Sequence, residues 1–137
     1  MDVNIGAVLA ATAVMFAIGA FWYMVPFGKI WGTMHGFDKL SKKEQKEAQA
    51  QMGPYYSIQL AVTIISAWVL AYFMVLLPDM AFYKIAFWVW LGFIVPTTAS
   101  NVIFGGTESK WIVRKTLISV GGSFVCTLAG AWVISLF

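Results

Sequence analysis

The sequence has little charge, one histidine and one cysteine, and this scarcity argues against most catalytic and metal-binding patterns. Asp, Glu, Lys and Arg make up 11% of the 137 residues, whereas about a quarter of a soluble domain is charged. Hydrophobic residues reach 61%, and a soluble core of this length could not bury so much apolar surface. The chain is therefore expected to be one domain that lies in the lipid bilayer, and the bilayer is its expected partner.

Four long apolar runs account for this composition. Each reaches the ~20 residues with which an α-helix crosses ~30 Å of hydrocarbon, and backbone groups in lipid must be paired within their own segment. The sequence therefore predicts an all-α fold, an integral membrane four-helix bundle that forms a single domain over residues 1–137. The predicted spans cover residues 3–25, 54–77, 80–104 and 108–136. We interpret the first run as a span rather than a secretory signal, because Asp2 precedes it and a signal needs a basic start.

Lysine and arginine are distributed unevenly between the two ends of the predicted bundle. Eight of the nine lie between the first and second runs or between the third and fourth, and Lys84 lies at the opposite end. The positive-inside rule then places both basic loops in the cytoplasm and both termini outside. We expect a multi-pass protein of an inner (cytoplasmic) membrane.

The loop between the first two runs contains one predicted soluble helix, over about residues 41–51. Ser41 and Glu44 form the S-x-x-E pattern of a capping box, in which each side chain accepts a backbone N–H of the other residue. The segment is polar on all sides and lacks the apolar stripe of a helix that lies on a membrane surface. It is interpreted as a solvated spacer or, alternatively, as a docking arm for a partner.

No Asp, Glu, Lys, Arg or His lies in the middle of a predicted span, where such groups usually mark proton relays and ion-coupled sites. His35 lies in the first loop with only Asp38 as a nearby acid, and zinc needs three or four ligands. Cys126 lies deep in the fourth span, where a small apolar packing role is expected. We assign no catalytic, cofactor-binding or metal-binding residue. Nucleic acid is not an expected partner, because the lysines are few and interleaved with acids.

Two segments carry side chains that could line a ligand site or pair between helices. One is the end of the first span, whose simpler interpretation is an interfacial aromatic anchor. The other follows Pro96, which removes one backbone hydrogen bond and frees the carbonyl of Gly92. The simpler interpretation there is a kinked helix with an amide that binds a neighbouring helix or water. The candidate ligand-lining or interhelical polar residues are Trp22, Tyr23, Thr97, Thr98 and Asn101.

Small residues follow one another at a spacing of four along the last span. Gly122, Cys126 and Gly130 form this row, and such rows let helices approach closely in lipid. We predict that these three residues pack against another helix. The pattern leaves open whether that helix belongs to the same chain or to a second chain.

Two motifs lie in the first and third spans. The first reads G-x-x-W-Y and then P-F-G-K-x-W, and the second reads W-L-G-F and then N-x-x-F-x-G. Their positions are Gly19, Trp22, Tyr23, Phe27, Gly28, Trp31, Trp90, Gly92, Phe93, Asn101, Phe104 and Gly106. With the Gly-rich last span, these motifs resemble a bacterial membrane-protein family of unknown activity, domain of unknown function 1761. The resemblance implies four short-looped helices in a bacterial membrane and no particular chemistry. The family usually has Ser-Pro after the tyrosine, whereas Met24 stands there in this sequence, so the local turn could differ.

Three functional hypotheses follow from the sequence. The first is a non-enzymatic membrane subunit that associates with itself or binds a membrane partner protein through its small-residue faces. The alternative is a small oligomeric transporter or channel for neutral or amphipathic solutes, lined by the polar patch at residues 97–101. The weakest hypothesis is a lipid-modifying membrane enzyme, because His35 with Asp38 is the only candidate acid–base pair in the sequence.

Overall fold

The structure is a computed structural model that describes residues 2–137, all in helices and their connections. The elements, in chain order, are α1 (Ile5–Met24), α2 (Gly28–Met34), η1 (Phe37–Lys39), α3 (Lys42–Ala50), α4 (Gly53–Leu76), α5 (Phe82–Val89), η2 (Trp90–Ile94), α6 (Val95–Phe104), η3 (Ser109–Trp111) and α7 (Ile112–Ser135). The all-α prediction is confirmed. Four continuous helical stretches are long and apolar enough to cross a membrane, and they correspond to the four predicted runs.

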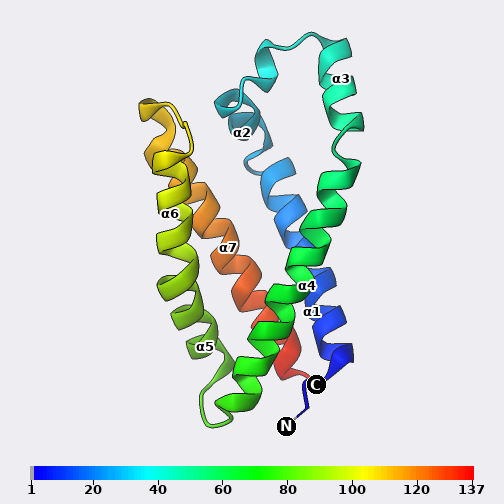
Figure 1. The fold of residues 1–137 in the computed structure, drawn as a ribbon, viewed down its shortest axis with the longest axis vertical. Helices are drawn as coiled ribbons and strands as arrows, with labels where there is room; N and C mark the ends of the chain where they lie inside the picture. The colour runs from blue at the N-terminus through cyan, green and yellow to red at the C-terminus, as the bar shows by residue number, and fades with distance from the viewer. Residues whose placement is uncertain (1) are drawn as a thin grey trace.

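The helices form an elongated bundle with α7 at its centre (Figure 1). α7 contacts α1 most extensively and also packs against α5, α6 and α4, while α1 and α4 contact each other. Both termini and the connection between α4 and α5 lie at one end, called here the terminal end. Eight of the nine lysines and arginines lie at the other end, between α1 and α4 or between α6 and the first turn of α7. This end is called here the basic end.

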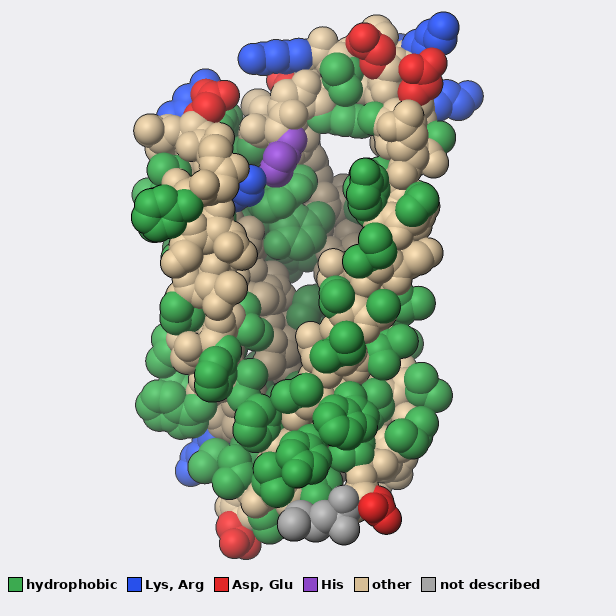
Figure 2. Space-filling view, in the orientation of Figure 1, with side chains coloured by type: hydrophobic (Ala, Val, Ile, Leu, Met, Phe, Trp, Pro, Cys, Tyr) green, Lys and Arg blue, Asp and Glu red, His purple; other side chains and the backbone are tan. Residues whose placement is uncertain are grey.

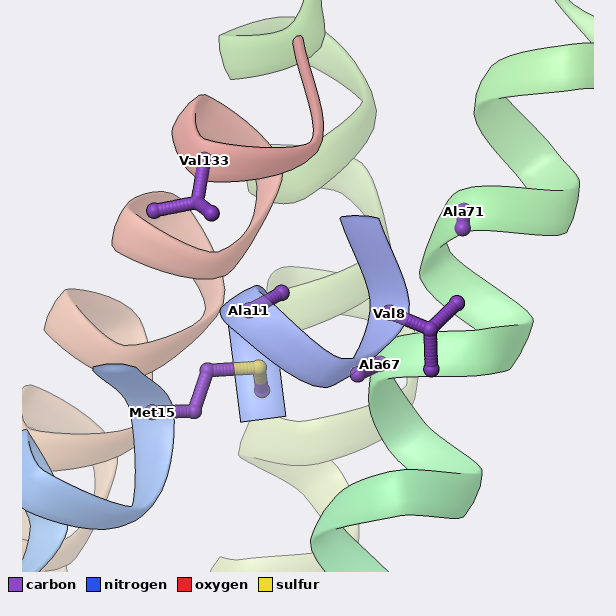
Figure 3. Packing of buried hydrophobic residues seen from close by; sticks show 6 residues of the cluster. All are labelled: Val8, Ala11, Met15, Ala67, Ala71 and Val133. Carbon is purple, nitrogen blue, oxygen red and sulfur yellow. The ribbon is translucent and has the colours of Figure 1, made fainter. Parts of the chain in front are cut away.

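The core lies in the half of the bundle near the terminal end. Ala11 of α1 and Ala67 of α4 have no exposed surface, and Val8, Met15 and Val133 complete the contact of α1, α4 and α7 (Figure 3). A second cluster, formed by Leu70, Ile85, Ala86 and Ala131, joins α4, α5 and α7. Alanine at the contact points lets these helices approach closely in lipid, where association depends on packing.

The basic end is open by contrast. Every residue of α4 from 53 to 62 is exposed, and Val102 is the one buried residue in α6. Figure 2 shows a hollow between the α4 and α6 sides of the molecule over this half. The four helices therefore converge at the terminal end and separate toward the basic end.

The helix that contains Pro96 differs from the prediction in its hydrogen bonding. A π-helical turn, η2, precedes the proline, and the backbone N–H of Val95 donates to the carbonyl of Trp90. The wider turn absorbs the irregularity that the missing proline N–H creates. Residues 82–104 remain one long helix, so the expected kink takes the form of a π-turn.

The first basic loop contains more helix than the sequence predicts. α3 is the predicted loop helix, but α2 and η1 were not expected. Gly36, with φ 74°, ends α2 and turns the chain into η1, in the left-handed region that glycine adopts without a steric penalty.

The capping box of α3 is present with both bonds. The Glu44 N–H donates to Ser41 Oγ at 3.2 Å, and the Ser41 N–H donates to Glu44 Oε2 at 2.8 Å. The bond from the Ser41 backbone lowers the pKa of Glu44, with a smaller contribution from the Ser41 side chain. Hydrogen bonds to the ionised carboxylate favour that form.

Acidification should therefore loosen the start of α3. A lowered pKa in the folded helix means that the stabilisation is present above the ordinary pKa of glutamate and is lost as pH falls through the lowered value. Backbone chemical shifts of residues 41–50 in micelles should move toward coil values over that acidic range. Glu44→Gln should abolish this dependence, and a shift that survives in Glu44→Gln would contradict the assignment.

Candidate functional site

A hydrogen bond holds Trp22 of α1 against α7, and Gly122 of α7 leaves room for its ring. Its indole N–H donates to the carbonyl oxygen of Ile118 at 2.9 Å. Its ring lies so close to Gly122 that a Cβ there would stand 2.8 Å from two ring atoms. An indole N–H in a low-dielectric surrounding needs an acceptor, and glycine lets the ring reach one.

The rest of the small-residue row also faces α1. A Cβ at Gly130 would stand 2.6 Å from the sulfur of Met15, and the Cys126 thiol donates to the carbonyl oxygen of Met15 at 3.5 Å. The row Gly122, Cys126 and Gly130 thus packs within the chain.

Trp90 contacts α7 from the π-turn η2. Its indole N–H donates to the carbonyl oxygen of Val120 at 2.8 Å, and its ring meets Phe124 edge-on with centroids 4.8 Å apart. Trp22 and Trp90 therefore both donate to the α7 backbone, two residues apart. These two bonds hold α1 and η2 in position along α7.

Aromatic and basic side chains meet where α2 lies near the start of α7. The ring centroid of Trp31 lies 4.6 Å from that of Tyr23 and 4.8 Å from that of His35. The Lys115 ammonium contacts His35 Nε2 at 3.1 Å and lies 5.6 Å from the Trp31 centroid. Residues from α1, α2 and α7 thus converge. We call Tyr23, Trp31, His35 and Lys115 the basic-end cluster.

The contacts of His35 define its hydrogen-bonding form. Its Nδ1 lies 2.8 Å from the carbonyl oxygen of Trp31, which only accepts, so Nδ1 carries the proton and donates. Nε2 then accepts from the Lys115 ammonium, which only donates. Neither ring nitrogen of His35 is hydrogen-bonded to Asp38 within residues 2–137, so the acid–base pair considered from the sequence is not formed there.

The polar patch of α6 is separate from this cluster. The Thr97 hydroxyl donates to the carbonyl oxygen of Phe93 in its own helix at 2.7 Å. Thr98 is half-buried, and Asn101 is exposed and makes no side-chain hydrogen bond in the described part of the chain. No hydrogen bond or ring contact links these residues to Trp22 or Tyr23 across residues 2–137. The structure therefore divides the five candidate residues between two places.

The contact among Trp31, His35 and Lys115 could not be predicted from the sequence. Trp31 and His35 are one helical turn apart, but that spacing carries meaning only once α2 is known to be a helix. Lys115 is 80 positions from His35, so no local pattern joins them. Trp31 was part of the motif, and this was the one available signal.

Four long apolar helices with exposed hydrophobic side chains around their outside define a multi-pass integral membrane protein. Water does not tolerate such a surface, whereas lipid covers it. The chain belongs to the family described as protein of unknown function (DUF1761), whose profile matches residues 6–135. No curated protein and no solved structure matches the chain.

The contact of Trp22 with Gly122 gives a direct stability test. Gly122→Ala should lower the unfolding free energy in detergent by about 1–3 kcal/mol, because the added methyl group displaces the indole from its acceptor. Gly92→Ala is the matched control, since a Cβ there meets nothing within 4 Å. Thermal unfolding followed by tryptophan fluorescence measures both. Equal stability of Gly122→Ala and the parent would refute the close contact.

Proposed function

We propose that this protein is a non-enzymatic membrane subunit that associates with a second copy of itself through the open halves of α4 and α6. The supporting observation is the exposure of α4 from residue 53 to residue 62. The other end of α4 is packed against α1 and α5 through Ala67, Leu70 and Ala71. One half of this helix is thus built into the bundle, and the other half is free to contact another chain.

Two amides on these open helices favour a protein partner over lipid. Gln59 of α4 and Asn101 of α6 are both exposed, and neither side chain has a hydrogen-bond partner among residues 2–137. Gln59 lies about 9 Å along α4 from its first residue, at ~1.5 Å per residue. Lipid tails cover apolar side chains but offer no hydrogen bonds, so the Gln59 amide favours a polar partner at this depth. Asn101 lies three residues before the end of α6, where a partner chain competes with headgroups and water for its amide.

A second copy satisfies this requirement most simply. An amide side chain both donates and accepts hydrogen bonds, so the same surface on two copies can be complementary to itself. Two-fold symmetric dimers are the commonest oligomers and use one patch on both subunits. The small-residue row supports no competing interface, because it is occupied by α1.

Replacing the amides should weaken the dimer in membranes. Gln59→Leu and Asn101→Leu should each raise the dissociation constant in liposomes about threefold to tenfold, the range of an interhelical hydrogen bond in lipid. Single-molecule photobleaching at varied protein-to-lipid ratios measures this constant. Ile58→Leu, at an exposed neighbour on α4, is the control and should leave it unchanged. A strictly monomeric parent protein would refute the proposal.

The hollow between α4 and α6 is the observation in favour of a solute pathway (Figure 2). Its proposed polar lining is weak, because the Thr97 hydroxyl donates to its own helix. The enzyme hypothesis has less support still, since the ring nitrogens of His35 face Trp31 and Lys115. A subunit that associates through α4 and α6 therefore remains the better proposal.

We further propose that the basic end faces the cytoplasm of a bacterial cell, with both termini outside. The distribution of lysine and arginine supports this orientation. In a Cys126→Ser background, an impermeant maleimide applied to intact spheroplasts should label Asp79→Cys and not Glu47→Cys. Inside-out vesicles should give the opposite result. Labelling of Glu47→Cys in spheroplasts would reverse the proposed topology.

A further inference from the structure

Lys115 is positioned differently from the other cations of the basic end. Its residue is half-buried, and its ammonium is directed to Trp31 and His35 rather than away from the bundle. Lys110, by comparison, pairs with Glu108 at 3.4 Å, and both side chains are more than half exposed. This pair is the sole ion pair in the described part of the chain.

The Lys115 ammonium has donors to spare and no carboxylate to receive them. An ammonium carries three N–H donors, and one of them is directed to His35 Nε2. No acidic side chain comes within 4.0 Å of Lys115 in residues 2–137. A half-buried cation beside an indole face, with N–H donors left unused, favours an anion as a further partner.

The surroundings of Lys115 fit a lipid better than a solute in water. Lys115 lies three residues into α7, about 4.5 Å along the helix at ~1.5 Å per residue, which is headgroup depth when the long apolar part of α7 fills the membrane. Figure 2 shows that the hollow between the α4 and α6 sides is open on this face of the molecule. An anion can thus arrive from the bilayer.

We propose that Lys115, His35 and Trp31 bind the phosphate group of an anionic phospholipid. The ammonium donates its free N–H groups to the phosphate oxygens, and the face of the Trp31 ring stabilises the ammonium by a cation–π contact. The His35 ring, held by its bond to the Trp31 carbonyl oxygen, fixes the position of the ammonium. This site is independent of the proposed dimer, because it uses neither Gln59 nor Asn101.

The test compares two lysines at the same end of the bundle. Binding of phosphatidylglycerol to the detergent-purified protein is titrated by native mass spectrometry, with phosphatidylcholine as the neutral lipid. Lys115→Gln should weaken phosphatidylglycerol binding about tenfold, as expected for loss of a charge-assisted hydrogen bond. Lys110→Gln removes the same charge from the same end and should change the affinity less than twofold, the small effect of an exposed charge. Lys115→Arg, which keeps the charge, should retain most of the affinity.

Three results would overturn the proposal. Equal losses in Lys115→Gln and Lys110→Gln would mean that surface charge alone attracts the lipid. Equal affinity for phosphatidylcholine would show that no anion is recognised. If inorganic phosphate displaced the lipid from the parent protein and bound it with the same affinity as phosphatidylglycerol, the site would be assigned to free phosphate. Thermal stability of each variant without added lipid separates these outcomes from misfolding, and dimer measurements on Lys115→Gln should match the parent.

Discussion

An N–H group in hydrocarbon must find an acceptor within the protein, and this constraint organises the bundle around α7. The indoles of Trp22 and Trp90 reach it from two sides and donate to the carbonyl oxygens of Ile118 and Val120. A helical carbonyl oxygen has a second lone pair for such a bond. Gly122 removes the side chain that would block Trp22. The contact that gives the Trp22 N–H its acceptor is thus also the contact that packs α1 closely against α7.

This arrangement explains why the bundle is closed at one end and open at the other. At the terminal end, Ala11 of α1 packs with Ala67 and Ala71 of α4, and Ala131 of α7 packs with Leu70 of α4 and Ala86 of α5. Toward the basic end, α7 is contacted by the large indoles of Trp22 and Trp90 instead, and residues 53–62 of α4 are exposed. Lipid covers the apolar side chains that are exposed where the helices separate. Packing these side chains against another helix would therefore add no hydrophobic stabilisation.

Hydropathy and capping patterns predict the elements of this fold but not their pairing. The four spans and the Ser41 capping box could be predicted because each depends on residues close in sequence. α2 could not be, since its seven residues include Gly28 and Gly32, and glycine disfavours helix; ring contacts with Tyr23 hold it. The basic-end cluster could not be predicted either, because Lys115 and His35 are 80 positions apart and meet only in the folded bundle.

The division between a packed half and an open half also explains where unpaired polar groups lie. The buried threonines of the packed half, Thr12, Thr63 and Thr127, each donate to the carbonyl four residues earlier, so their hydroxyls need no ligand. Gln59, Asn101 and Lys115 all lie in the open half, and each has donors that the chain does not use. A bundle stable through one half can leave such groups for lipid or another chain. The proposed dimer contact and the proposed lipid site therefore both lie toward the basic end, where the helices of the chain pack less closely.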